Sequence, residues 1–185
     1  MNRVEALLRA YASQVALPWV TGLSGGEKVW FCIYDKGDER RLRLYLPEFG
    51  TATGAARRGW REVDLTSAFA EWMAGQEYRD EYFRKPRLLT DHKLRDFLKV
   101  LARRISDELK AAGPEAVLAL SGIGGLFGLL RVSEVIQAVE PQIEGRLLVF
   151  FPGEFENGNY RLLDARDGWS YRAVPILPDQ GAPRA

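Results

Sequence analysis

Apolar residues follow two different spacings along the chain. Short continuous runs rich in β-branched and aromatic residues occupy 29–34 (VWFCIY), 117–120 and 147–151, and 60–65 (WREVDL) is a further candidate. Runs of this length and composition are typical of strands buried on both faces, as parallel sheets require. The pattern therefore predicts four strands spread over most of the chain.

Between these runs, apolar residues recur at spacings of three and four, which predicts amphipathic helices. The clearest stripe lies between Thr90 and Gly113-Pro114, where a glycine and a proline end the pattern. A first helix is expected at 2–17, and another runs from Thr66 or Ser67 toward Tyr82. The polar residues that the pattern predicts as helix caps are Asn2, Asp38, Thr66 or Ser67, Thr90 or Asp91, and Ser133.

Strands that alternate with helices predict βαβ units and a mainly parallel sheet. The segments 160–163 and 171–176 are expected to form a hairpin that turns at Asp167-Gly168. We therefore predict an α/β fold: one domain at 1–177, a three-layer sandwich with about five to six strands, helices on both faces and a C-terminal β-hairpin. Residues 178–185, with two prolines and one glycine, are expected to be a flexible tail.

Composition narrows the class of protein. Lys and Arg total 26 against 25 Asp and Glu, so the formal net charge of +1 gives no overall field that attracts polyanions. Direct binding to nucleic acid is therefore not favoured, although a local basic patch stays possible. The single cysteine excludes an internal disulfide, and no apolar run reaches the length of a membrane span. With Glu5 where a signal peptide would begin its apolar region, we expect a soluble cytoplasmic protein without membrane contact.

A glycine-rich turn follows the predicted strand at 117–120 and is a weak candidate for a phosphate or cofactor site. Its residues are Ser121, Gly122, Gly124 and Gly125. The pattern lacks the Gly-Lys-Ser/Thr of a P-loop, and Phe127 stands where a dinucleotide fingerprint needs glycine. Two interpretations remain: a tight structural turn, or a nucleotide-binding domain that has lost its phosphate loop. We expect no cofactor.

Three carboxylates at predicted strand ends are weak candidates for a metal site: Asp35, Asp64 and Glu154. Magnesium prefers carboxylate oxygens, so these residues would suit a metal-dependent phosphoesterase or nuclease. Strand-end acidic residues also cap helices and close turns, and no D-x-D pair occurs here. His92 is the only histidine and Cys32 lies inside a predicted strand, so nucleophilic catalysis is poorly supported. We expect neither a metal nor catalysis.

The segment 145–176 is the most distinctive part of the chain: GRLLVFFPGEFENGNYRLLDARDGWSYRAVPI. It resembles the BrxB family of bacterial BREX phage-resistance systems. The resemblance extends from about Lys28 to Ile176 and includes VWFCIYD at 29–35, RRGWREVDLTSAFAEWM at 57–73, EYRDEYF at 77–83 and LSGIGGLFGLLRVSEVI at 120–136. It implies a small non-catalytic component of an anti-phage complex that also contains a DNA methyltransferase, an ATPase and a PglZ protein.

What the resemblance implies is an adaptor that binds other BREX proteins, with PglZ as the first choice. Rigid aromatics mixed with charged and amide groups suit a protein interface. The candidate partner-binding residues are Phe155, Asn157, Asn159, Tyr160, Arg161, Asp164, Arg166, Asp167 and Trp169. The alternative is that these aromatics cover the sheet edge while the polar groups hold its turns. The N-terminal helix is a second contact candidate.

Overall fold

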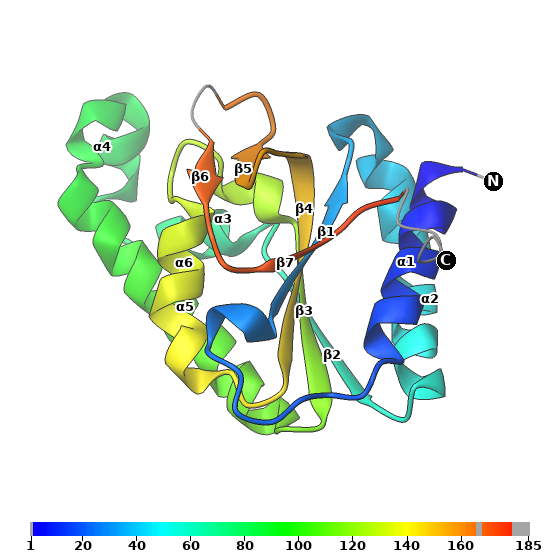
Figure 1. Ribbon diagram of the computed structural model, residues 1–185. Coiled ribbons are helices and arrows are strands. Elements are labelled where there is room, and N and C mark those ends of the chain that lie inside the picture. The colour runs from blue at the N-terminus through cyan, green and yellow to red at the C-terminus, as the bar shows by residue number, and fades with distance from the viewer. Residues whose placement is uncertain (1, 166–167, 179–185) are drawn as a thin grey trace.

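A computed structural model describes residues 2–165 and 168–178, and within them a seven-stranded sheet forms the centre of the molecule (Figure 1). The parallel part has the order β2-β3-β4-β1-β7. Its strands are β1 (Val29–Tyr34), β2 (Gly59–Asp64), β3 (Ala116–Ser121), β4 (Arg146–Glu156) and β7 (Val174–Ile176). Antiparallel to the end of β4 lies β5 (Asn159–Leu162), which pairs in turn with β6 (Trp169–Ser170).

Helices cover both faces of this sheet. One face carries α1 (Arg3–Val15) and α2 (Glu39–Ala55), and the other carries α5 (Asp91–Ala112) and α6 (Val132–Val139) (Figure 1). Two short helices, α3 (Ala68–Ala74) and α4 (Arg79–Arg84), connect β2 to α5. Short 3₁₀ turns lie at Gly26–Lys28, Lys36–Asp38, Pro86–Leu88, Ile123–Leu126 and Glu140–Gln142. The predicted α/β class, with its mainly parallel sheet between helical layers, is confirmed.

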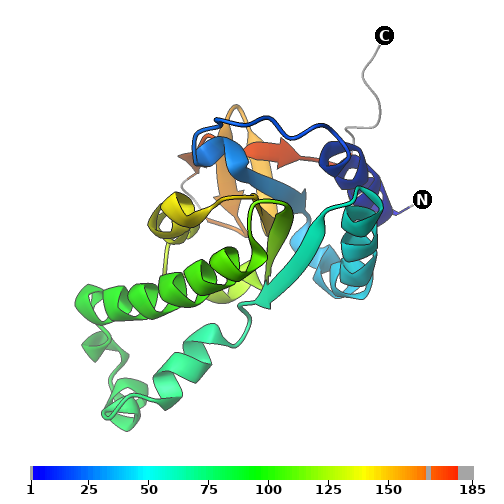
Figure 2. The ribbon, with the colours of Figure 1, turned by 90° about the horizontal axis from the view of Figure 1, so that it is seen from below.

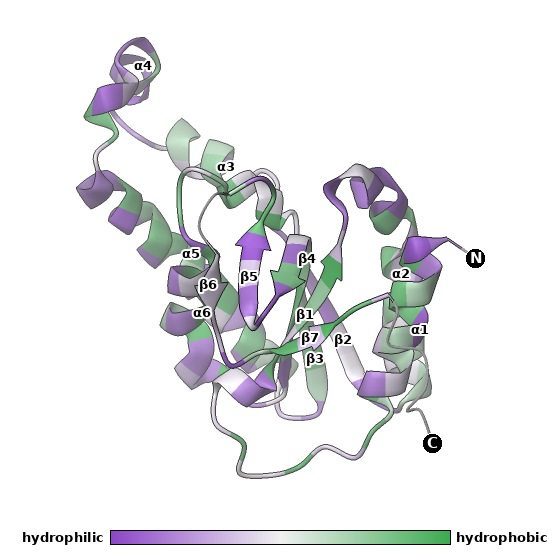
Figure 3. Ribbon diagram, turned by 45° about the horizontal axis from the view of Figure 1, so that its top comes forward, coloured by the Kyte–Doolittle hydropathy of each residue, from purple (hydrophilic) through white to green (hydrophobic). Residues whose placement is uncertain are grey.

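The strand β1 shows how the sequence pattern produces two apolar cores. All six of its side chains are buried, and alternate residues point to opposite faces of the sheet. Phe31 packs in the core under α5 and α6, whereas Trp30 and Cys32 pack in the core under α1 and α2. The continuous apolar run at 29–34 is thus explained by burial on both faces. Figure 3, coloured by hydropathy, shows hydrophobic residues in the central strands β1 and β3, between the helices on either side.

The helix boundaries confirm part of the prediction. Asn2 caps α1: its Oδ1 accepts a hydrogen bond from the Glu5 amide at 3.0 Å, and the Glu5 carboxylate accepts one from the Asn2 amide. The predicted cap at Ser133 is wrong, because α6 begins earlier, with Arg131 as its cap residue. Asp38 does precede α2, but its carboxylate pairs with Arg41 rather than with a helix amide.

The single helix predicted from Thr66 or Ser67 toward Tyr82 is also wrong. It divides into α3 and α4, with Gly75 as the C-cap of α3. Glycine is a poor helix former and commonly ends helices, so α3 stops there. The next helix, α4, starts in a new direction away from the sheet (Figure 2). The result is a projecting connection between α3 and α5.

The C-terminal strands pair differently from the predicted hairpin. The tight turn lies at Asn157-Gly158, where both residues have positive φ (50° and 79°), and it joins β4 to β5. Two central residues with positive φ match the twist of a two-residue hairpin, and Asn-Gly is the pair that tolerates them best. β6 does pair with β5, but 174–176 joins β1 in parallel. Asp167, at the predicted turn, lies outside the described residues.

The helices and the C-terminal end bear on two predictions made from the sequence. In the described ranges, no helix has both the length and the apolar character needed to cross a bilayer. The predicted tail falls almost wholly on 179–185, which lie outside the described residues. The division into a domain at 1–177 and a tail stays a prediction.

Candidate functional site

The carboxyl ends of β1 and β4 lie side by side and border a cavity of about 530 Å³. The register pairs Tyr34, the last residue of β1, with Pro152, so β1 ends at this edge of the sheet while β4 continues to Glu156. Ligands of parallel α/β folds bind at this edge. The side chains that line the cavity include Arg3, Tyr34, Asp35, Asp38, Glu154, Phe155, Glu156 and Arg161.

The three candidate metal carboxylates do not gather in this cavity. Asp35 and Glu154 line it, but Asp64 ends β2, which β3 separates from β4. Asp35 Oδ1 accepts a hydrogen bond from the Gly37 amide at 2.7 Å, and Glu154 is paired with Arg161. Within residues 2–165 and 168–178, no group of three or more potential ligands is placed to hold a metal ion. Each carboxylate instead has a local partner.

Asp64 belongs to a polar network at the edge of the sheet. Its Oδ1 accepts a hydrogen bond from the Thr66 amide at 2.9 Å, and Arg43 reaches Oδ2 at 3.3 Å while donating to the Thr66 hydroxyl at 2.7 Å. Burial alone would raise the pKa of Asp64, but the Thr66 hydrogen bonds and the Arg43 charge outweigh it and lower the pKa from its ordinary value. The network therefore stabilises the ionised carboxylate and holds the loop after β2 in place.

We expect the substitution Asp64→Asn to lower stability by about 0.5–1 kcal/mol at pH 7, since half of the side chain is exposed to solvent. Because the folded-state pKa of Asp64 is lowered, its contribution is complete above the unfolded-state pKa and is lost as the pH falls through the folded value. Urea unfolding of both proteins between pH 7 and pH 2 tests this. A difference that stays constant down to the lowest pH would contradict the assigned charge interaction.

The glycine-rich turn packs directly against this network. Gly122 has a φ of 70°, and a Cβ atom there would lie 2.3 Å from the Thr66 hydroxyl and 2.5 Å from Asp64 Oδ1. A Cβ at Gly125 would lie 3.1 Å from the Thr66 carbonyl, while Gly124 has ordinary contacts. The absence of side chains thus allows the loop after β2 to approach the turn. Ser121, which the sequence placed in this turn, is the last residue of β3, and its hydroxyl donates a hydrogen bond to Glu62 at 3.0 Å.

Nucleophiles and basic runs also have ordinary structural surroundings. Cys32 is fully buried, and burial raises the pKa of its thiol, which keeps the sulfur protonated. His92 is exposed on the first turn of α5. Adjacent arginines occur at 57–58 and 103–104. Arg58 pairs with Glu115 and stacks on Trp19 at 4.2 Å from the ring centre, and Arg104 pairs with Glu71 at 3.4 Å. One arginine of each pair is thus engaged within the chain.

The candidate partner-binding aromatics point into the molecule. Tyr160 is fully buried, with its ring centre 4.5 Å from Phe31, 4.7 Å from Phe155 and 5.3 Å from Trp169. Its hydroxyl donates to the Ala173 carbonyl at 3.0 Å, and burial raises its pKa. Edge-to-face and tilted aromatic contacts of this kind add to the stabilisation from burial. The aromatics therefore hold β5 and β6 against the sheet.

The polar candidates point outward from the same hairpin. β4 continues past the end of β1, so that 153–156 and β5 project beyond the parallel sheet. Asn157, Asn159 and Asp164 are exposed, and Arg161 is partly exposed beside Glu154. The hairpin thus presents amide and charged groups on an aromatic base. Arg166 and Asp167, also candidates, lie outside the described residues.

No pattern in the sequence predicted the long-range polar contacts at the site. Lys36 pairs with Asp164, 128 positions away, and so ties the 3₁₀ turn before α2 to the segment that follows β5. Arg43 meets Asp64 across 21 positions. The hairpin turn did have a signal, since Asn157-Gly158 is the commonest tight-turn pair.

Comparisons with known proteins give one match. A family described as "BREX protein BrxB" matches residues 62–176, which is more than half of the chain. Comparison with curated proteins and with solved structures gave no match. The matched range begins within β2 and includes the glycine turn, the projecting α4 and the hairpin, while β1 and the two helices that cover its face lie before it.

Proposed function

The chain belongs to the BrxB family and is therefore a component of a BREX system, and from this premise we propose that it is a non-catalytic accessory protein. In this proposal it acts by binding another protein of the BREX complex, with PglZ as the first partner to test. The β4–β5 hairpin is the proposed contact surface.

The observation that carries the proposal is the division of the hairpin into two sides. Its inner side is a packed aromatic cluster built around Tyr160, which is fully buried. Its outer side carries Glu154, Asn157, Asn159 and Arg161, all with solvent exposure. Polar groups held on a rigid base lose little conformational entropy when a partner binds, which favours tight association.

Charge pairing within the hairpin gives the proposal a sharp test. Glu154 and Arg161 lie directly opposite each other in β4 and β5, and their side chains are paired. The double substitution E154R/R161E exchanges the two charges while keeping opposite charges across the strands. The fold should be retained, but a partner that reads these positions would meet reversed charges, which are strongly unfavourable at an interface.

We expect the exchanged variant to recover at least about tenfold less PglZ than the unmodified chain in pulldowns from cells that hold the full BREX set. A matched control is R61E/E108R, which exchanges an exposed ion pair between β2 and α5. Its recovery of PglZ should equal that of the unmodified chain. If the unmodified chain recovers no BREX protein, the adaptor proposal is wrong. Equal recovery by both variants would instead exclude the hairpin as the contact surface.

A further inference from the structure

The connection between α3 and α5 places several large apolar side chains in solvent. We call residues 76–90 the arm; it contains α4 and the 3₁₀ turn Pro86–Leu88. Tyr78, Phe83 and Leu88 have 60%, 70% and 42% of their surface exposed, and Val100 on the adjoining α5 has 54%. Figure 2 shows the arm extending from the body of the molecule beside the start of α5. Three large exposed apolar side chains within 78–88 make the arm a candidate site of protein association.

Burial shows that these apolar residues contribute little to folding. α4 has six residues and buries only Tyr82, and its cap residue, Tyr78, makes no capping hydrogen bond through its side chain. Helices this short are unstable without tertiary packing. From Phe83 to Leu88 every residue is exposed, giving the surface sequence FRKPRL. The apolar groups are thus displayed together with basic ones.

Ion pairs on the arm leave an excess of positive charge. The carboxylates of Asp80 and Glu81 pair within the arm, with Arg79 at 3.8 Å and Arg84 at 3.1 Å respectively. In the described part of the chain, the basic Arg87, Lys93 and Arg95 form no ion pair, and neither do the acidic Glu77 and Asp91, so the excess among these unpaired groups is one positive charge. A complementary surface would therefore carry carboxylates beside apolar side chains.

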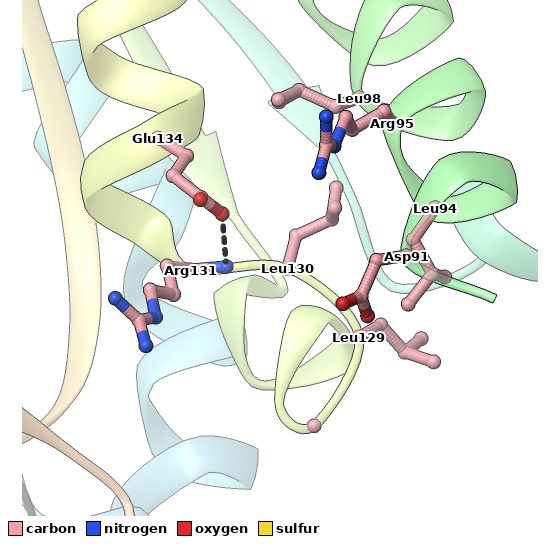
Figure 4. Close-up of a pocket in the computed structure, with 9 residues that line it drawn as sticks. Asp91, Leu94, Arg95, Leu98, Leu129, Leu130, Arg131 and Glu134 are labelled. Carbon is pink, nitrogen blue, oxygen red and sulfur yellow. Dashed lines mark hydrogen bonds between the residues drawn. The ribbon is translucent and has the colours of Figure 1, made fainter.

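A cavity of about 530 Å³ begins where the arm ends, at Asp91. Its apolar lining comes from Leu94 and Leu98 on α5 and from Leu129 and Leu130 on the loop before α6. Figure 4 shows the Arg95 guanidinium over Leu130, at the side of this cavity. The charged lining of the cavity has both signs, with Arg95 and Arg131 against Asp91 and Glu134. The space is large enough to admit an apolar side chain of a partner, with a carboxylate of that partner beside Arg95.

We propose that the arm and this cavity bind an acidic segment of a partner protein whose apolar side chains pack on Phe83 and Leu88. The carboxylates of that segment lie against Arg87 and Arg95, and one apolar anchor enters the cavity between α5 and the loop before α6. This surface is separate from the β4–β5 hairpin. It therefore does not depend on contact through the hairpin.

Site-specific crosslinking tests the proposal. A photo-reactive phenylalanine replaces Phe83 in the full chain, and the control carries it at Leu44, which is 76% exposed on α2. After irradiation in cells with the full BREX set, mass spectrometry identifies the crosslinked peptides. We expect position 83, but not position 44, to crosslink a partner segment with adjacent acidic and apolar residues. Crosslinks to nucleic acid, to a second copy of this chain, or to no molecule would overturn the proposal.

Affinity for the identified segment, made as a synthetic peptide, gives the second test. We expect Phe83→Ala and Arg87→Glu each to weaken binding by about tenfold or more in fluorescence anisotropy, because each removes a central contact. Higher salt should weaken binding to the unmodified chain. Leu44→Ala and the hairpin exchange E154R/R161E should leave it unchanged. Equal affinity of all variants, or tighter binding to a 20-nucleotide single strand of DNA than to the peptide, would contradict the proposal.

Discussion

Replacement of Phe31 by alanine is expected to lower the free energy of unfolding by about 3–5 kcal/mol. Phe31 is fully buried in the middle of β1, and its ring centre lies 5.3 Å from Phe151, 4.5 Å from Tyr160 and 5.8 Å from Trp169. The substitution would leave a cavity between the sheet and the C-terminal strands. Since domains are stable by only about 5–15 kcal/mol, this loss is a large fraction of the total.

Urea unfolding followed by circular dichroism measures this effect. Phe127→Ala is the matched control, because Phe127 is 47% exposed and its truncation should cost about 0.5 kcal/mol or less. The aromatic cluster also supports the proposed contact surface, so Phe31→Ala should weaken the recovery of partners as well. A loss of stability below about 1 kcal/mol would show that the cluster is not packed as described here.

Gly122→Ala should be strongly destabilising for so small a substitution. The left-handed φ of 70° costs alanine about 1 kcal/mol, and the new Cβ would collide with Thr66 and Asp64 at 2.3 Å and 2.5 Å. Relief of the collision requires the loop after β2 to move, at about 1–3 kcal/mol. We therefore expect a total loss of about 2–4 kcal/mol in thermal or urea unfolding.

Gly128→Ala separates the two contributions to this loss of stability, which are the backbone strain and the collision of the new Cβ atom. Gly128 has a φ of 76°, close to that of Gly122, but a Cβ there would meet no atom within 4 Å. Its substitution should cost about 1 kcal/mol, from backbone strain alone. If both variants lose the same stability, the close approach of the loop after β2 is not what requires glycine at position 122. A glycine kept open for a phosphate would then become the stronger interpretation.

Several elements were predictable because their causes are local. A continuous apolar run at 29–34 specifies a strand buried on both faces, and the stripe after Asp91 specifies α5. Asn2 and Glu5, three residues apart, specify the start of α1 through contacts within one turn. The distinctive segment 145–176 was sufficient to indicate the family, and the family match confirms it.

Other predictions failed where a distant contact competed with local preference. The residues 174–176 have a strand pattern, yet β1 rather than β5 supplies their partner. Strand pairing depends on which edge the rest of the fold leaves open, and that information is not in the segment itself. Likewise, no local pattern shows that aromatic side chains in and beside α4, such as Tyr78 and Phe83, would be exposed among polar residues.

The amino-acid sequence by itself determined the class of fold, the extent of most helices and strands, and the family, because periodicity and capping act over a few residues. Only the tertiary structure decided the strand order, the direction in which Tyr160 and Trp169 point, and the separation of Asp64 from Asp35 and Glu154. These features depend on contacts between distant segments, such as Lys36 with Asp164, 128 positions apart, and Trp30 with Val174, 144 positions apart. Such contacts form only when the whole chain packs, since the energy of each one depends on where all the other elements lie.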